Sequence, residues 1–349
     1  MEIIHIKDQF PDHFYALAET IYKDLPYRPE EDRQHTDELL KFANKSSEIL
    51  LVTDRKNVRL LAICPPGKTK AYFGFWETTD DFYSCQKAFE ILFDELKNRG
   101  YSGIEGPVHF NTFHRYRLRL QTPSWKMFNR EPVNPEYYPA FLERLGFKIH
   151  HTYESRLIKT EVVPEVYRSK KELVDSVRDL PFEFIPLNPQ TWSEKEPEIF
   201  ELINHIFGLN PGFQSIPIEE FRLLYNAEYA AQLCPHTSVL LADRSSGKLV
   251  AISLCHPNYT ALNLSEKPVF EKHYPLLNHR TMLAKTQGVH PDFRQLGLMN
   301  YLGAYGMLSF RKYYNDIIFC LMRADNPSLR FTDAFDHEKV EYASYIREI

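Results

Sequence analysis

The sequence predicts two consecutive α/β domains, each built around a mixed β-sheet. The chain has 349 residues, which is more than a single domain usually holds. A hairpin pattern occurs twice, as two apolar runs around a polar turn at residues 54–57 and again at residues 244–248. A strand, an amphipathic helix and another strand follow each hairpin, in the order of a crossover connection. This shared order predicts a structural repeat with domains at 1–162 and 163–349.

The first domain is predicted to begin with helices, because apolar residues recur at helical spacing near the start of the chain. Gly100 marks the end of a long amphipathic helix, since glycine often follows a helix C-terminus. The expected elements are helices at 8–24 and 30–43, strands at 48–53, 58–64 and 71–77, a helix at 82–99, a strand at 102–110, a helix at 135–145 and a strand at 147–158.

The second domain repeats this order with weak residue identity to the first. The expected elements are a helix at 164–177, a strand at 182–186, helices at 192–207 and 218–232, strands at 237–243, 249–255 and 281–289, a helix at 294–314, a strand at 316–322, a helix at 326–335 and a strand at 339–346. Each domain therefore joins an antiparallel hairpin to a strand–helix–strand crossover.

Composition indicates an ordinary globular protein, with 43% hydrophobic and 26% charged residues. The net charge of −5 does not favour nucleic acid as a partner. Arg115, Arg117 and Arg119 alternate, which suits either phosphate contacts or, as the favoured interpretation, a solvated strand face. Five cysteines without a CxxC pair predict reduced thiols and no metal site. No signal peptide or apolar membrane span is recognisable, so we expect a cytoplasmic protein with no membrane partner.

The segment 281–299 carries the clearest chemical pattern. A strand ends at Val289, a turn follows, and Arg294-Gln295-Leu296-Gly297 is predicted to open a helix. The free N–H groups and the dipole of a helix N-terminus attract anions. A glycine at this point lets a ligand approach the backbone closely. A pyrophosphate group is the natural occupant of such a site.

Val289, Pro291, Arg294 and Gly297 match a known pattern at this place. The segment resembles motif A of the GNAT superfamily of acyl-CoA-dependent N-acyltransferases. The resemblance implies acetyl-CoA or another acyl-CoA as co-substrate. Its cofactor-binding residues would be Val289, Arg294, Gln295, Leu296, Gly297, Leu298 and Met299. The sequence departs from the pattern at Met299, where the family prefers glycine or alanine.

A second match lies after the strand at 316–322. Asn326 fits the asparagine that, in the family, opens the next helix beside the pantetheine arm of the cofactor. The family then often has a tyrosine that protonates the leaving thiolate, but this chain has Asp333 there. Tyr342 or Tyr345 is the candidate substitute, with departure of the thiolate without a proton donor as the alternative. His290 is the candidate general base, because an unperturbed histidine titrates near neutral pH, with a water relay or a plain loop residue as the alternatives.

The first domain lacks this pattern. Residues 78–81 contain no glycine and bring two carboxylates, which would repel a pyrophosphate. We therefore expect the fold without the cofactor. His109, Asn111 and His114 are candidates for a polar substrate pocket, or for turn hydrogen bonds alone. Cys255 and His256 are neighbours on a predicted strand and point to opposite faces, which argues against a Cys–His nucleophile.

The favoured functional hypothesis is an N-acyltransferase that moves an acyl group, most simply acetyl, from acyl-CoA to the amine of a small molecule. Backbone N–H groups near Val289 would polarise the thioester carbonyl. A second hypothesis is a tandem GNAT-fold transferase that uses an aminoacyl-tRNA as donor. A third is a non-catalytic protein that binds CoA as a sensor or scaffold.

Overall fold

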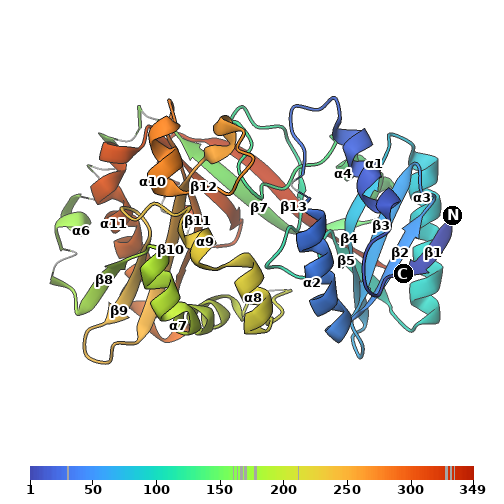
Figure 1. Ribbon diagram of the computed structural model, residues 1–349, viewed down its shortest axis with the longest axis horizontal. Coiled ribbons are helices and arrows are strands. Elements are labelled where there is room, and N and C mark those ends of the chain that lie inside the picture. The colour runs from blue at the N-terminus through green and yellow to red at the C-terminus, as the bar shows by residue number, and fades with distance from the viewer. Residues whose placement is uncertain are drawn as a thin grey trace. The chain divides into compact units, whose positions relative to one another are not determined.

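The structure is a computed structural model of the whole chain. It describes residues 1–349 except 30, 160, 163, 166, 167, 169, 170, 177, 178, 211, 327, 328, 331 and 334. The chain forms two compact units (Figure 1). The first comprises Met1–Thr122, Arg130–Tyr153 and Glu341–Ile349, and the second comprises Pro123–Asn129 and Glu154–Val340. These units differ from a linear division at 162/163, because residues 123–129 and 154–162 belong to the second unit and residues 341–349 to the first.

The first unit contains a sheet in the order β1-β2-β3-β4-β5-β13. Its strands are β1 (Glu2–His5), β2 (Glu48–Thr53), β3 (Val58–Cys64), β4 (Lys70–Thr78), β5 (Gly103–Gly106), the short β6 (Leu118–Arg119) and the end of β13 (Glu338–Glu348). Its helices are α1 (Asp12–Tyr22), α2 (Arg33–Ser46), α3 (Phe82–Asn98) and α4 (Tyr138–Arg144). β13 pairs with β5 through Tyr345↔Gly106, so the last strand of the chain completes the sheet of the first unit.

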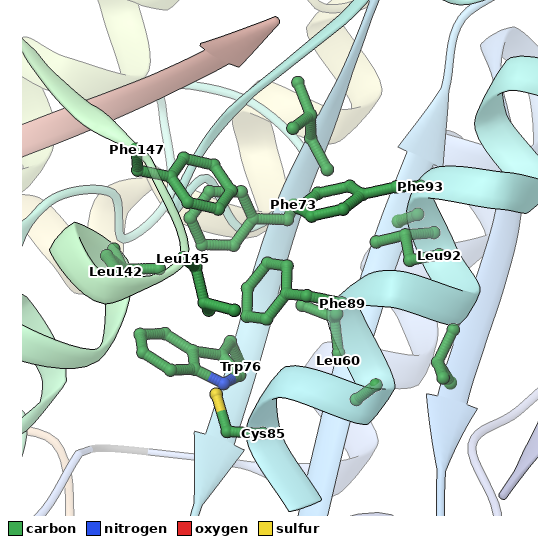
Figure 2. Packing of buried hydrophobic residues seen from close by; sticks show 14 of the residues in the cluster. Leu60, Phe73, Trp76, Cys85, Phe89, Leu92, Phe93, Leu142, Leu145 and Phe147 are labelled. Atoms are coloured by element: carbon green, nitrogen blue, oxygen red, sulfur yellow. The ribbon is translucent and has the colours of Figure 1, made fainter. Parts of the chain in front are cut away.

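Helix α3 forms because apolar residues recur along one of its faces. The buried set is Cys85, Ala88, Phe89, Leu92, Phe93 and Leu96. Figure 2 shows this face packed against Phe73 and Trp76 of β4 and against Phe147. The ring centroids of Phe73 and Phe89 are 5.5 Å apart, an edge-on contact that aromatic pairs favour. Each fully buried phenylalanine contributes about 1.5–3 kcal/mol from the removal of apolar surface from water.

The second unit contains a sheet in the order β7-β12-β11-β10-β9-β8. Its strands are the end of β7 (Lys148–Ile158), β8 (Phe182–Pro186), β9 (Val239–Asp243), β10 (Leu249–Pro257), β11 (Thr281–Val289) and β12 (Asp316–Arg323). Its helices are α6 (Lys171–Ser176), α7 (Pro189–Phe207), α8 (Ile218–Leu224), α9 (Ala227–Ala230), α10 (Phe270–His273) and α11 (Leu298–Tyr313). None of the helices in the described part of the chain has the length and apolar character needed to cross a membrane.

Both faces of the β11–β12 pair are covered. Met282 and Ala284 belong to a buried cluster with Met307 and Phe310 of α11. Leu283, the residue between them, lies in another cluster with Phe128 from the segment 123–129. The alternation follows from the strand geometry, in which successive side chains point to opposite faces.

Several predicted boundaries shift. The helix predicted at 294–314 begins at Leu298, because Pro291–Leu296 forms a 3₁₀-helix (η4) and Gly297 adopts a left-handed conformation. The strand predicted at 102–110 ends at Gly106, immediately before Pro107. The helix predicted at 218–232 is two short helices, α8 and α9. The helices predicted at 164–177 and 326–335 fall partly on residues outside those described.

Candidate functional site

The parallel pair β11–β12 stays together over only part of its length. Pairing runs from Thr281↔Asp316 to Ala284↔Phe319. Beyond Ala284, β11 continues to Val289 and β12 continues to Arg323 without further pairs in this register. Leu321 takes a positive φ of 55°. Its N–H donates to the hydroxyl of Ser155 in β7 at 3.0 Å, on the side of β12 away from β11. The two central strands therefore separate toward their C-terminal ends.

A β-bulge lies where the strands separate. The register of β11 with β10 passes from Ala284↔Cys255 to Thr286↔Leu254 and skips Lys285. The Lys285 ammonium donates to the Asn129 carbonyl at 2.5 Å and lies 5.5 Å from the centroid of the Phe128 ring. Segment 123–129 is thereby held against β11 on the face opposite α11.

The start of α11 follows this strand closely. Gly297 is the N-cap residue with φ 67°, and no side chain caps the helix. A Cβ added at Gly297 would meet only the Asn300 amide nitrogen, at 3.9 Å, so the space above the backbone is open. The first turn of α11 contains no acidic residue. The N–H groups at this helix start can therefore donate hydrogen bonds to an anionic ligand.

The corresponding helix start in the first unit is built differently. Asp81 is the N-cap of α3, and its carboxylate accepts the N–H groups of Tyr83 and Ser84 at 3.0 and 3.3 Å. The Ser84 hydroxyl donates to the same carboxylate at 2.6 Å. This hydrogen bond, together with the backbone donors, lowers the pKa of Asp81. The protein's own carboxylate occupies the place where an external anion would bind.

The central strands of the first unit also remain in contact past the end of β5. The Val108 N–H donates to the Phe73 carbonyl at 2.7 Å. A Cβ on Gly74 would lie 1.9 Å from the Val108 carbonyl oxygen, so only glycine fits there. The His109 ring stacks on Phe75 with centroids 3.9 Å apart. The residues after β5 thus fill the space beside β4 in the first unit. In the second unit, the corresponding space lies between β11 and β12, where the strands separate.

Comparison with solved structures identifies the fold. A tandem GNAT protein from the clavulanic acid biosynthesis pathway aligns with a TM-score of 0.56 at 11% identity, over 99% of this chain and 98% of that one. The chain has a tandem GNAT fold. A probable N-acyltransferase from Enterococcus faecalis V583 aligns with a TM-score of 0.55 at 10% identity, over 100% of this chain and 72% of that one.

A third structure with the GNAT fold extends this comparison. It contains the GCN5-related glucosamine N-acetyltransferase region of a fungal multi-domain GH3 β-N-acetylglucosaminidase, with a TM-score of 0.51 and 9% identity over 99% of this chain and 38% of that one. No family model matches the sequence, and no curated protein matches it. The likeness is therefore one of fold, at identities too low to transfer an activity.

Within this GNAT fold, Arg294 has a structural contact. Its guanidinium donates to the Ile206 carbonyl at 3.0 Å, near the C-terminal end of α7, and to the Val289 carbonyl at 3.4 Å. A cation at a helix C-terminus is stabilised by the helix dipole. Arg294 thus fastens the turn before Gly297 to α7. Of its neighbours, Gln295 and Leu296 are exposed.

The remaining motif residues support or flank the helix start. Leu298 is 1% exposed and belongs to a buried cluster with Val289. Met299 is partly buried and packs against that same cluster, which accounts for a large side chain at this position. Asn326 is exposed, follows the end of β12, and its N–H donates to the Arg323 carbonyl at 2.9 Å.

His290 lies at the end of β11 nearest to α11. It is 4% exposed, and its ring packs 4.9 Å from His205 and 5.9 Å from Phe293. Burial lowers its pKa, with a smaller contribution from Lys248. His290 follows Lys285 by five positions, which corresponds to about 16 Å in an extended strand. The ring therefore lies far from the bulge.

Tyr342, the other predicted catalytic residue, belongs to the first unit. It is fully buried, pairs with Arg119 of β6, and donates its hydroxyl to Glu131 at 2.7 Å. His290 belongs to the second unit, so the two predicted catalytic residues lie in different units. Tyr345 is likewise buried in the core of the first unit. Sequence order misleads here because β13 passes from the second unit into the first.

Asp333, at the position where the family often has a tyrosine, makes an ion pair. Its carboxylate lies 2.7 Å from the guanidinium of Arg156. Arg156 is 7% exposed and also pairs with Glu154. Asp333 therefore serves to neutralise a buried cation, a role that the sequence pattern does not reveal.

A buried ionic cluster in the first unit was not expected from the sequence. Arg59 and Glu77 are each 1% exposed and lie 3.8 Å apart. Arg115 lies 3.7 Å from Glu77 and 3.4 Å from the His109 ring nitrogen. Burial, with Arg115 as the next cause, holds the pKa of His109 well below its usual value. Arg59 and Glu77 sit in otherwise apolar strands, which hides the cluster in the sequence.

The favoured sequence interpretation of the alternating arginines is wrong. Arg117 and Arg119 are 8% and 4% exposed, so they do not form a solvated strand face. Arg117 takes a positive φ of 82°, which interrupts the regular alternation of a strand. All five cysteines are buried free thiols. Burial raises the pKa of Cys255 to about 12, which makes this thiol unreactive.

Proposed function

We propose that the second unit binds an acyl-CoA at the start of α11 and transfers the acyl group to the amine of a small molecule. The observation that carries the proposal is the uncapped helix start at Gly297, which the 3₁₀-helix Pro291–Leu296 connects to a strand that separates from its parallel neighbour beyond Ala284. A GNAT fold of this kind is shared with an N-acetyltransferase region and a probable N-acyltransferase.

The donor atoms at this place suit a pyrophosphate. The amide groups of Gly297, Leu298 and Met299 form the N-terminal turn of a 16-residue helix, whose dipole favours negative charge. Gln295 and Leu296 would flank the phosphates. The pantetheine arm would extend between β11 and β12 toward the bulge, with Asn326 beside it.

In the reaction, the amine nitrogen attacks the thioester carbonyl carbon. A C–N bond forms, the C–S bond breaks, and the amine loses a proton. Backbone N–H groups of β11 between the bulge and Val289 would stabilise the negative charge on the carbonyl oxygen. Holding the amine against the thioester supplies much of the acceleration.

Proton transfer then falls to water. His290 lies about 16 Å from the bulge in an extended strand, too far for direct contact with the amine. Asp333 is engaged by Arg156 and does not replace the missing tyrosine. A thiol with a pKa of about 8.5 can leave as its anion without a dedicated acid. We therefore propose a water relay as the base and an unassisted thiolate as the leaving group.

Isothermal titration of acetyl-CoA and longer acyl-CoAs into the protein tests the donor site. Gly297→Glu places a carboxylate at the helix start, and Gly297→Ala is the matched control because it carries the same left-handed backbone without the charge. We expect the Glu variant to lose at least tenfold more affinity than the Ala variant, which corresponds to about 1.4 kcal/mol. Absence of binding by the wild type to any acyl-CoA would overturn the proposal.

A CoA-binding protein without catalysis is the second candidate, favoured by the engagement of Asp333 and by the location of Tyr342 in the first unit. Release of free thiol from acetyl-CoA in the presence of a panel of small amines separates the two. Amine-dependent thiol release supports the transferase. Tight acyl-CoA binding with no release across the panel supports the non-catalytic alternative.

A further inference from the structure

Arg119 of β6 is a buried arginine whose guanidinium has no anionic partner among the described residues. The residue is 4% exposed, and its Nη2 atom makes no hydrogen bond to them. Its hydrogen bonds to the described residues are made by its backbone: its N–H donates to the Asn134 side chain at 2.7 Å, and its carbonyl accepts from the same side chain at 3.2 Å. The guanidinium stacks on the Tyr27 ring, 4.2 Å from the centroid.

This arrangement is costly for a protein. An arginine side chain does not lose its proton under ordinary conditions, so it cannot avoid the cost of burial by becoming neutral. A buried charge without a partner is strongly unfavourable, and a contact with one aromatic ring offsets only part of that cost. A buried charge without a partner therefore calls for an explanation, and a ligand that supplies the opposite charge is one.

Arg156 shows how the same chain treats a buried arginine with a structural role. At 7% exposure, it pairs with Glu154 and Asp333. It also donates to the Thr332 hydroxyl at 3.0 Å and to the Leu329 carbonyl at 3.2 Å. Arg119 has none of these contacts at comparable burial. The difference marks Arg119 as a binding residue.

We propose that the first unit binds a small carboxylic acid, with Arg119 as the group that receives its carboxylate. The planar guanidinium fits a carboxylate through two parallel hydrogen bonds. Tyr27, held by a hydrogen bond from its hydroxyl to the Asn134 carbonyl at 3.3 Å, keeps the guanidinium plane in place.

The charges near Arg119 favour a singly charged carboxylate over a phosphate. Tyr342 stands opposite Arg119 in the β6–β13 pair, so their side chains share a face. The Tyr342 hydroxyl donates to Glu131 at 2.7 Å, which brings a buried carboxylate into this neighbourhood. Its charge opposes a dianion more than a monoanion, and attracts an amino group on the ligand. The site is independent of the acyl-CoA proposal, which concerns the second unit.

Thermal unfolding of Arg119→Met and Arg156→Met tests the inference without knowledge of the ligand. Methionine has a similar length and keeps the contact with the Tyr27 ring. We expect Arg119→Met to melt at the wild-type temperature or above, because an uncompensated buried charge is removed. Arg156→Met should melt about 5 °C lower or more, because it removes the cation that pairs with both Glu154 and Asp333. A comparable loss in Arg119→Met would show a structural role and overturn the proposal.

Thermal shifts of the whole protein with glycine, leucine, acetate, succinate and inorganic phosphate then test the ligand class. We expect at least one carboxylate to raise the melting temperature of the wild type by about 2 °C at a concentration well above its Kd, and to leave Arg119→Met unchanged. A larger shift with the amino acids than with acetate would indicate that Glu131 takes part. A shift with phosphate alone, or with none of the five, would overturn the assignment of a carboxylate.

Discussion

Helices α3 and α11 follow corresponding strands in the two units, but their first turns are completed by different means. In α3, the Asp81 side chain satisfies the N–H groups of the first turn. In α11, Gly297 provides no side chain, and the turn has no capping hydrogen bond. A protein usually caps its helices with its own side chains because this contributes stability. The missing cap leaves the N–H groups of the first turn of α11 available, as the proposed acyl-CoA site requires.

The sheets beside these helices also differ, because the first unit fills a space with its own residues that the second unit leaves open. After β5, Val108 remains hydrogen-bonded to β4, and His109 covers Phe75. After Ala284, β11 and β12 separate. The first unit therefore uses its own backbone and side chains to fill the place that corresponds to the proposed acyl-CoA site of the second unit. The comparison teaches that two units of the same fold can be packed alike while only one of them has an uncapped helix start beside separated strands.

Gly74→Ala should produce the largest effect on this comparison. The new Cβ would lie 1.9 Å from the Val108 carbonyl, so the backbone must move. We expect a loss of about 3 kcal/mol or more in the free energy of unfolding, measured by urea denaturation.

The matched control for Gly74→Ala is Gly306→Ala in α11, where nothing lies within 4 Å of the added carbon. Alanine in a helix interior should raise stability by about 0.5–1 kcal/mol. The same substitution would then have opposite signs in the two units. Equal effects would show that the segment after β5 can move away from β4. The space beside β4 would then not be filled as tightly as the contacts indicate.

Asn300→Asp adds a negative charge to the first turn of α11 with almost no change in shape. Asn300 is exposed, and its N–H donates to the Gly297 carbonyl at 3.0 Å. The helix dipole should stabilise the carboxylate by about 0.3–1 kcal/mol, so the melting temperature should stay the same or rise. The same charge should weaken acyl-CoA binding about tenfold, because it repels the phosphates.

The control for this charge is Asn263→Asp, at an exposed turn outside the first turn of α11. It should leave acyl-CoA affinity unchanged in titration calorimetry. A rise in stability without any loss of affinity in Asn300→Asp would place the phosphates elsewhere.

Local patterns in the sequence were sufficient for much of this fold. The apolar spacing of α3 and the two hairpins predicted those elements, because local periodicity and turn residues determine them. The tandem GNAT fold itself was predicted from Val289, Pro291, Arg294 and Gly297 and is confirmed by the structural comparison. The residues assigned to acyl-CoA in that segment stay a prediction.

Other features depend on contacts between distant parts of the chain. The pairing of Tyr345 with Gly106 joins residues that are far apart in the sequence, and no local pattern predicts it. For this reason the sequence did not indicate that Tyr342 belongs to the first unit. The burial of Arg119 is equally invisible, because an arginine beside a leucine on a short strand has the pattern of a surface residue. Such groups are found only once tertiary packing shows which charges have partners.

Asp81→Ala tests the smallest difference between the two helix starts. It removes the acceptor for the Tyr83 and Ser84 N–H groups, and we expect a loss of about 1 kcal/mol in the free energy of unfolding at pH 7. The pKa of Asp81 is lowered in the folded protein, so its contribution is present above the unfolded value of about 3.9 and is lost as the pH falls below it. The difference from the wild type should therefore shrink below about pH 4. Asp80→Ala is the matched control, because this exposed neighbour is not the cap of α3. An equal loss from both substitutions would mean that general charge, and not the cap, stabilises α3, and the contrast with α11 would lose its physical basis.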